Sequence, residues 1–195
     1  MSATRFVRTL PAGRTHLDQL AEPLAALYAQ TGRLDRWGRE LARVLTAGGR
    51  LLAVGNGGSA CQAQHLTAEI VGRYRDDRPP YAAIALCTET SALTAIGNDY
   101  GFEELFARQV RGHGREGDVL IALSTSGTSP NILAAVEAAA GCGMRTWALA
   151  GRPGCGLALR CDDALCVDSD DTATIQEIHL IAIHLVCAAF DTEIG

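Results

Sequence analysis

His65 and Glu69 are the first residues whose types and spacing could perform chemistry. They stand four positions apart, which on a helix places the imidazole and the carboxylate on one face, one turn apart. They run beside the apolar Leu66 and Ile70, so the pair could border a cleft. Such a pair can bind zinc or transfer protons. A solvated His–Glu ion pair is an equally good interpretation of the spacing alone.

The last helical pattern, residues 172–190, is apolar nearly all round and is expected to be buried on more than one side. Buried polar groups need partners, and this segment carries Gln176, Glu177, His179 and His184. A satisfied core histidine is the usual explanation of a lone His184. Gln176, however, lies eight positions earlier, about 80° round the helix and about 12 Å along its axis. The spacing allows a stretched zinc site formed by His65, Glu69, Gln176 and His184. Some of these ligands could come from a neighbouring subunit.

A glycine-rich turn, Gly55-Asn56-Gly57-Gly58-Ser59-Ala60, joins an apolar run to a helical pattern. Glycines let the backbone turn tightly and approach a ligand closely. The free N–H groups and the positive end of the following helix suit an anion. A plain tight turn with Ser59 as N-cap is equally consistent with these residues.

A second turn, Ser124-Thr125-Ser126-Gly127-Thr128-Ser129-Pro130-Asn131, carries five hydroxyl groups within six residues. One hydroxyl is enough to cap a helix, so the others are expected to serve a ligand. Hydroxyl and backbone N–H groups at the start of a helix can bind phosphate without a fixed positive charge. The chain contains no G-x-x-x-x-G-K-[ST] motif, so this turn is not the phosphate loop of a nucleotide hydrolase.

Short apolar runs alternate with helical patterns from residue 50 onward. We predict strands at 51–54, 82–86, 119–123, 146–150 and 164–167, and helices at 59–72, 103–112, 130–140 and 172–190. The alternation predicts a five-stranded parallel sheet with helices on both faces, a three-layer α/β sandwich. Ligands bind beyond the carboxyl ends of the strands in such sheets, which points to the turns that follow residues 54 and 123.

Two helical patterns precede the first strand. Gly32 is expected to separate them and Gly48-Gly49 to end the second. We expect one domain over residues 1–195, in which 1–49 pack on the sheet or pair with another chain and 50–195 form the α/β core. The leucine-rich stripes of the two helices are Leu17, Leu20, Leu24 and Leu27, then Leu34, Trp37, Leu41, Val44 and Leu45.

Composition narrows the classes of function. With 48% hydrophobic and 20% charged residues the chain is typical of a folded domain, and its net charge of −5 argues against nucleic acid as a partner. No apolar run approaches the roughly 20 residues of a membrane span. Seven scattered cysteines without a C-x-x-C motif fit a reducing cytoplasm better than disulfides or a cysteine–zinc site. We expect the arginine-containing residues 1–14 to be a frayed tail rather than a targeting segment.

Several motifs in this order closely resemble the phosphoheptose isomerase family, which has the sugar isomerase (SIS) fold, a flavodoxin-like arrangement. The resemblance covers residues 51–185. It rests on Gly55-Asn56-Gly57-Gly58-Ser59, Ala63-Gln64-His65, Glu69 with Gly72-Arg73-Tyr74, Gly97-Asn98-Asp99-Tyr100-Gly101-Phe102, Arg115-Glu116-Gly117-Asp118-Val119-Leu120, Ser124-Thr125-Ser126-Gly127 and Ile175-Gln176-Glu177-Ile178-His179.

The resemblance implies a cytoplasmic homotetramer with active sites shared between subunits and one zinc ion in each. The implied reaction converts sedoheptulose 7-phosphate to D-glycero-D-manno-heptose 7-phosphate, an early step toward activated heptose. By resemblance the sugar contacts are Asn56, Gly57, Gly58, Asn98 and Asp99, and the phosphate contacts are Ser124, Thr125, Ser126 and Ser129. The implied zinc ligands are His65, Glu69, Gln176 and His184. Gln176 is also an implied substrate contact.

Glu69 and His184 match the acid–base pair of that family. An aldose–ketose isomerisation through an enediol needs one group for the carbon proton and one for the oxygen proton, and carboxylate and imidazole suit these tasks. A zinc-bound carboxylate is a weaker base, so Glu69 is interpreted as a ligand that becomes a base when substrate displaces it. Thr174 stands where relatives often have arginine, which leaves the sugar preference open.

Two other functions compete with this interpretation. Some relatives with the same fold are non-catalytic adaptors of the bacterial replication initiator, and they resemble the chain just before Asn98. Those relatives lack the glutamate and the second histidine, whereas this chain has Glu69 and His184. The other alternative is an isomerase of a different sugar phosphate, because the phosphate loop would be the same.

Overall fold

A computed structural model describes residues 12–195 of the chain, so most of the expected N-terminal tail lies outside the described residues. Five parallel strands form one sheet in the order β2-β1-β3-β4-β5. This is the flavodoxin-like order, and it confirms the predicted five-stranded parallel sheet. The strands are β1 (Leu51–Gly55), β2 (Ala83–Ala85), β3 (Val119–Ser124), β4 (Arg145–Ala150) and β5 (Asp163–Cys166).

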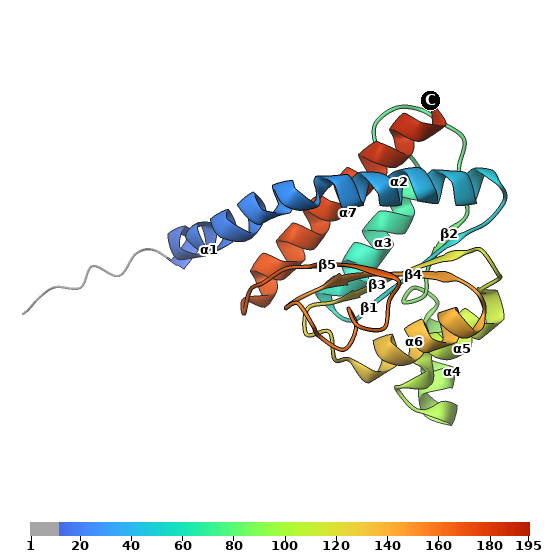
Figure 1. Cartoon of the computed structure of the whole chain (residues 1–195). Coiled ribbons are helices and arrows are strands. Elements are labelled where there is room, and N and C mark those ends of the chain that lie inside the picture. Colours follow the sequence, from blue (N-terminus) through green and yellow to red (C-terminus); the bar gives the residue numbers. More distant parts are fainter. Residues whose placement is uncertain (1–11) are drawn as a thin grey trace, which may run out of the picture.

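Helices cover both faces of the sheet and make three layers (Figure 1). On one face α2, α3 and α7 pack over one buried apolar cluster, and on the other α4, α5 and α6 pack over a second. The central strands β1 and β3 are buried along their whole length because both their faces are covered. The helices are α1 (Ala12–Leu27), α2 (Thr31–Thr46), α3 (Gly58–Val71), α4 (Thr90–Tyr100), α5 (Glu104–His113), α6 (Pro130–Gly141) and α7 (Thr172–Ile194).

Two predictions about the helices were wrong. Helix α4 was missed because only Ile96 of its residues is buried, so no apolar stripe marks it, although the Glu89 side chain caps it. The break between the first two helices was placed at Gly32, but it is a short 3-10 turn at Tyr28–Gln30, and Gly32 lies in the first turn of α2. A glycine costs about 1 kcal/mol in a helix, which the buried stripe of α2 outweighs.

Helix α7 is the central helix of its layer. Contrary to the expectation that no segment approaches a membrane span, its length and composition would allow it to cross a membrane. Here it packs against α2 and α3, and ten of its residues are buried. Trp37 of α2 stacks on Trp147 of β4 with ring centroids 5.1 Å apart, and its indole N–H donates to Asp163 at 2.9 Å. These contacts fix α2 on one face of the sheet.

Helix α1 extends the line of α2 past the body of the sheet (Figure 1). It is joined to α7 through His16, whose Nε2 lies 3.0 Å from both carboxylate oxygens of Glu177. The hydrogen bond and the charge of Glu177 raise the pKa of His16. Leu17 and Leu24 of this helix remain exposed, as does Tyr28 in the 3-10 turn that follows it.

Candidate functional site

The glycine-rich turn and the hydroxyl-rich turn lie side by side at the carboxyl end of the sheet. They follow β1 and β3, which are neighbours in the sheet, and Gly55 pairs in register with Leu123. The strand order reverses direction between these two strands, which is where ligands bind in open α/β sheets. The fold therefore brings both predicted turns to one edge.

Three hydroxyl groups converge in the hydroxyl-rich turn. Ser124 Oγ lies 3.4 Å from both Ser126 Oγ and Ser129 Oγ, and it accepts a hydrogen bond from the Gly127 N–H at 3.1 Å. Gly127 has φ +65°, a conformation that favours glycine. Ser129 is the N-cap residue of α6, yet its side chain caps no N–H group of the described chain. The hydroxyls are thus directed at one another beside a helix N-terminus, an arrangement that suits phosphate. Thr125 lies in the same turn.

The glycine-rich turn begins α3 without a side-chain cap. The N-cap residue is Gly57, whose own φ is +54°, while Ser59 lies inside the helix and is buried, so the alternative of a Ser59 cap is wrong. Gly58 is in contact with α7, because a Cβ atom there would lie 2.5 Å from the amide nitrogen of Gln176. No described side chain therefore caps the first turn of α3. The side-chain amide of Gln176 lies against this turn.

Asn56 and Asn131 form a reciprocal amide pair that the sequence analysis missed. Each Nδ2 donates to the other residue's Oδ1 at 2.9 Å, and Asn131 is fully buried. Asn131 is the second residue of α6, so the pair joins the glycine-rich turn to the end of the hydroxyl-rich turn. The side chain of Asn56, predicted to touch the sugar, is occupied in holding the two turns together. An asparagine directly after a serine-rich turn was the available signal.

Asn131→Asp should lower kcat/KM by about tenfold or more. The aspartate keeps the size of the side chain but turns the amide donor into an acceptor facing Asn56 Oδ1, and an unsatisfied buried polar group costs about 1–3 kcal/mol. Steady-state kinetics and thermal unfolding of the variant measure both effects. Asn131→Asp with the unaltered kcat/KM would show that the amide pair does not position the two turns.

His65, Glu69 and His184 meet at the facing surfaces of α3 and α7. His65 Nε2 lies 3.0 Å from His184 Nε2 and 3.3 Å from Glu69 Oε1, and one ligand atom from each residue lies within 4.8 Å of the others. Two atoms bound to one tetrahedral zinc at about 2.0–2.1 Å are separated by about 3.3 Å. The separations of His65 from His184 and from Glu69 are close to this value, so the three groups could hold a metal ion.

The surroundings of His184 favour the neutral form of its imidazole. Burial, followed by the neighbouring His65, lowers the pKa of His184. The Tyr74 ring stacks on that of His184 with centroids 5.6 Å apart and an interplanar angle of 29°. A neutral ring held in place by an aromatic neighbour offers a lone pair for a metal or a proton.

The other polar residues of α7 have separate tasks. His179 is the fully buried histidine of this helix: its Nε2 lies 3.0 Å from the Ala150 carbonyl oxygen, and burial lowers its pKa to about 4. The core-histidine explanation considered for His184 applies to His179 instead. Glu177 binds His16. Gln176 lies against Gly58 and its carbonyl oxygen accepts from Gln62 at 2.5 Å.

Asn98 and Asp99 are not brought to these groups within one chain. They lie exposed in the last turn of α4, in the layer opposite to α3 and α7, where Asn98 Nδ2 donates to Asp99 Oδ1 at 2.8 Å. Thr174 is fully buried, and its backbone N–H donates to the Asp171 carboxylate that caps α7. This position serves the start of α7.

Known proteins of one family resemble this chain over most of its length. The SIS domain family model matches residues 15–151. The phosphoheptose isomerase of Streptomyces coelicolor is 61% identical over 176 residues, which cover 90% of this chain and 76% of that protein. Solved phosphoheptose isomerases superpose closely: that of Neisseria gonorrhoeae at TM-score 0.84 and 42% identity, and that of Francisella tularensis at 0.86 and 35%. Each of the two covers 92% of this chain and 96% of the solved one.

Proposed function

The chain belongs to the phosphoheptose isomerase family of SIS-domain proteins, and we propose that Glu69 and His184 are the acid–base pair of its reaction. It is a sugar-phosphate isomerase that converts sedoheptulose 7-phosphate to D-glycero-D-manno-heptose 7-phosphate, an early step toward activated heptose. The observation that carries the residue assignment is the meeting of His65, Glu69 and His184 within 4.8 Å.

The two groups divide the proton transfers. Glu69 removes a proton from C1 of the ketose, the electron pair forms the C1–C2 double bond, and the C2 oxygen gains a proton, which gives the enediol. Glu69 then returns a proton to C2 while the O1 hydroxyl loses its proton and becomes the aldehyde. His184 carries the proton between the two oxygens, because a neutral imidazole can both accept and donate near neutral pH.

The phosphate is held by the hydroxyl-rich turn in this proposal. Ser124, Thr125, Ser126 and Ser129 donate to its oxygens beside the positive N-terminal end of α6. The sugar contacts are Gly57, Gly58 and Gln176 at the first turn of α3. Asn56 holds the glycine-rich turn in place through its hydrogen bonds to Asn131.

Zinc fits the donors His65, Glu69 and His184, and Gln176 is the proposed fourth ligand. These residues would hold the ion, and a zinc ion bound there would supply positive charge to stabilise the enediolate. Glu69 has two carboxylate oxygens and lies at 19% side-chain exposure, so it can hold a metal in the resting protein and remain within reach of substrate. We interpret it as a ligand first and a base once substrate has displaced it.

The structure also bears on the assembly of the protein and its cellular compartment. We propose one domain over residues 1–195, in a cytoplasmic homotetramer whose sites combine residues of neighbouring subunits. The exposed apolar residues of α1 support a role of the N-terminal helices in assembly. Asn98 and Asp99 lie in α4, away from the other proposed site residues of the same chain, which supports a site shared between subunits. Seven free thiols support a reducing compartment.

Incubation with a panel of ketose phosphates, with and without a zinc chelator, tests the function. We expect turnover of sedoheptulose 7-phosphate, loss of turnover on chelation and recovery on addition of Zn²⁺. Turnover of a hexose or pentose phosphate alone would support the isomerase of another sugar phosphate. Binding of the replication initiator without any turnover would support the adaptor, against which the presence of both Glu69 and His184 argues.

A further inference from the structure

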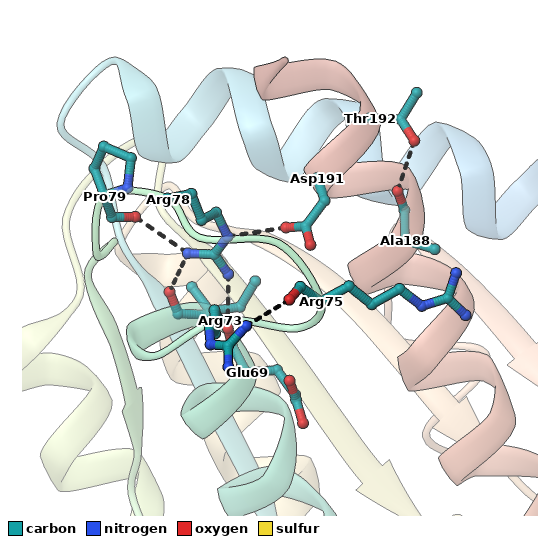
Figure 2. Close-up of polar contacts among 9 residues, drawn as sticks. Glu69, Arg73, Arg75, Arg78, Pro79, Ala188, Asp191 and Thr192 are labelled. Carbon is teal, nitrogen blue, oxygen red and sulfur yellow. Dashed lines mark hydrogen bonds and ion pairs between the residues drawn. The ribbon is translucent and has the colours of Figure 1, made fainter.

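Arg78 lies in the segment between α3 and β2 and holds the end of α3 to α7 (Figure 2). Its Nη2 donates to the Glu69 carbonyl oxygen at 2.6 Å and its Nη1 to that of Ile70 at 2.9 Å. Its Nε donates to Asp191 Oδ1 at 2.9 Å. A further bond from Nη1 reaches the Pro79 carbonyl oxygen at 3.2 Å. One guanidinium therefore connects both helices that carry the zinc-site residues.

The two ends of this contact are placed to act on the site. Glu69 and Ile70 belong to the last turn of α3, where carbonyl groups have no partner within the helix and a cation is favourable. The Arg78 bond is made to the backbone of Glu69 itself. Asp191 follows His184 by seven positions, which places both on nearly the same face of α7, about 20° apart. Arg78 thus contacts α3 at Glu69 and α7 on the face of His184.

Burial makes the contact specific. The Arg78 side chain is only 7% exposed and that of Asp191 18%. The guanidinium also lies over the Phe190 ring, 5.1 Å from its centroid, and over the Tyr81 ring at 5.6 Å. A planar group with donors in fixed directions satisfies three carbonyls and a carboxylate at once, which a lysine, with three donors, cannot do.

We propose that Arg78, with Asp191, is a positioning residue of the isomerase: it sets the distance between Glu69 on α3 and His184 on α7. The inference rests on the proposed roles of these two residues. Partners that orient metal-binding side chains commonly change metal affinity by about 10–100-fold when they are removed. Tyr74, four residues before Arg78 in the same segment, stacks on His184 and adds a second contact of this segment with α7.

The test compares Arg78→Lys and Asp191→Asn with Arg43→Lys in the full-length protein. Arg43 is a matched control, because it also pairs with a carboxylate of α7, Glu193, at 3.2 Å, but it extends from α2 and is 70% exposed. Each variant is titrated with Co²⁺, whose visible absorption reports its coordination geometry, and its kcat and KM are measured. Circular dichroism shows whether each variant is folded.

Arg78→Lys and Asp191→Asn should bind Co²⁺ about tenfold or more weakly, with an altered spectrum, and should lose kcat by a similar factor with little change in KM. The phosphate turn lies at the other end of α3, so KM is spared. Arg43→Lys should match the unaltered protein. A folded Arg78→Lys protein with unchanged Co²⁺ binding and kcat, or one no worse than Arg43→Lys, overturns the proposal.

If Arg78→Lys does not fold, Asp191→Asn decides by the same two readouts. If the unaltered protein binds no Co²⁺, the proposed metal site fails, and Arg78 is judged by kcat alone. A fall in kcat at constant KM that spares Arg43→Lys then still supports positioning of Glu69 and His184, and an unchanged kcat overturns it.

Discussion

Replacing Glu69 with glutamine is expected to lower kcat by about 10²–10⁴-fold with a much smaller change in KM. Glutamine has nearly the same size and can still accept a hydrogen bond, but it cannot take the proton from C1. The proposed phosphate contacts lie in the turn after β3 and do not involve this side chain, so we expect substrate binding to be retained. Steady-state kinetics and entry of solvent deuterium at C2 of the product measure the loss.

Titration of Glu69→Gln with Co²⁺ separates the two roles of this carboxylate. If Co²⁺ binding persists while turnover and deuterium entry stop, Glu69 is a base and its role as ligand is secondary. If both are lost together, the ligand role suffices to explain the loss of activity. Full turnover in Glu69→Gln rules out the base. Glu137→Gln is the control, because Glu137 lies on the exposed side of α6 in a surface ion pair with Arg160, and such pairs contribute little.

Replacing His184 with glutamine is the second change for which we expect a loss of about 10²–10⁴-fold in kcat. The amide of glutamine reaches about as far as Nε2, the atom that faces His65, but it does not titrate near neutral pH and binds a metal weakly. Weaker Co²⁺ binding is therefore expected as well. His113→Gln, at the exposed end of α5, is the matched control.

The double variant tests whether Glu69 and His184 act together. Residues of one catalytic unit are strongly non-additive, so Glu69→Gln combined with His184→Gln should be little worse than the more severe single change. Losses that multiply would indicate two independent contributions. An active His184→Gln protein would remove the imidazole from the proposed mechanism and leave a sugar-phosphate binder with a different acid.

Most of the fold could be predicted from the sequence because its signals are local. Apolar runs such as Leu51–Gly55 identify strands buried on both faces, and the three- and four-residue spacing in α2 identifies a helix with one buried stripe. Helix α4 shows the limit of this reasoning. It buries only Ile96, so its capping by Glu89 was the remaining signal, and nothing periodic distinguishes it from a loop.

The site was predictable only in part, since spacing along one helix says nothing about the helix it faces. The four-residue interval between His65 and Glu69 and the run of hydroxyls at 124–129 were visible as residue types in the chain. Their spacing does not show whether His65 and Glu69 form only a surface ion pair. The fold answers this, because it places His184, 119 positions away in the chain, 3.0 Å from His65. The same holds for the bonds of Asn131 to Asn56 and of Arg78 to Asp191.

The sequence alone determined the order of the five strands and of the described helices other than α4, the two polar turns that follow β1 and β3, and the side chains that could serve as acid, base and ligand. The strands and helices follow from backbone propensity and from burial patterns that repeat every two residues in a strand and every three to four residues in a helix. Only the tertiary structure decided which polar groups meet, that His179 is the core histidine while His184 faces α3, and that Asn56 supports a turn. The physical reason is that these pairings depend on how α3, α6 and α7 pack against one sheet, and helix packing joins residues that are far apart in the chain.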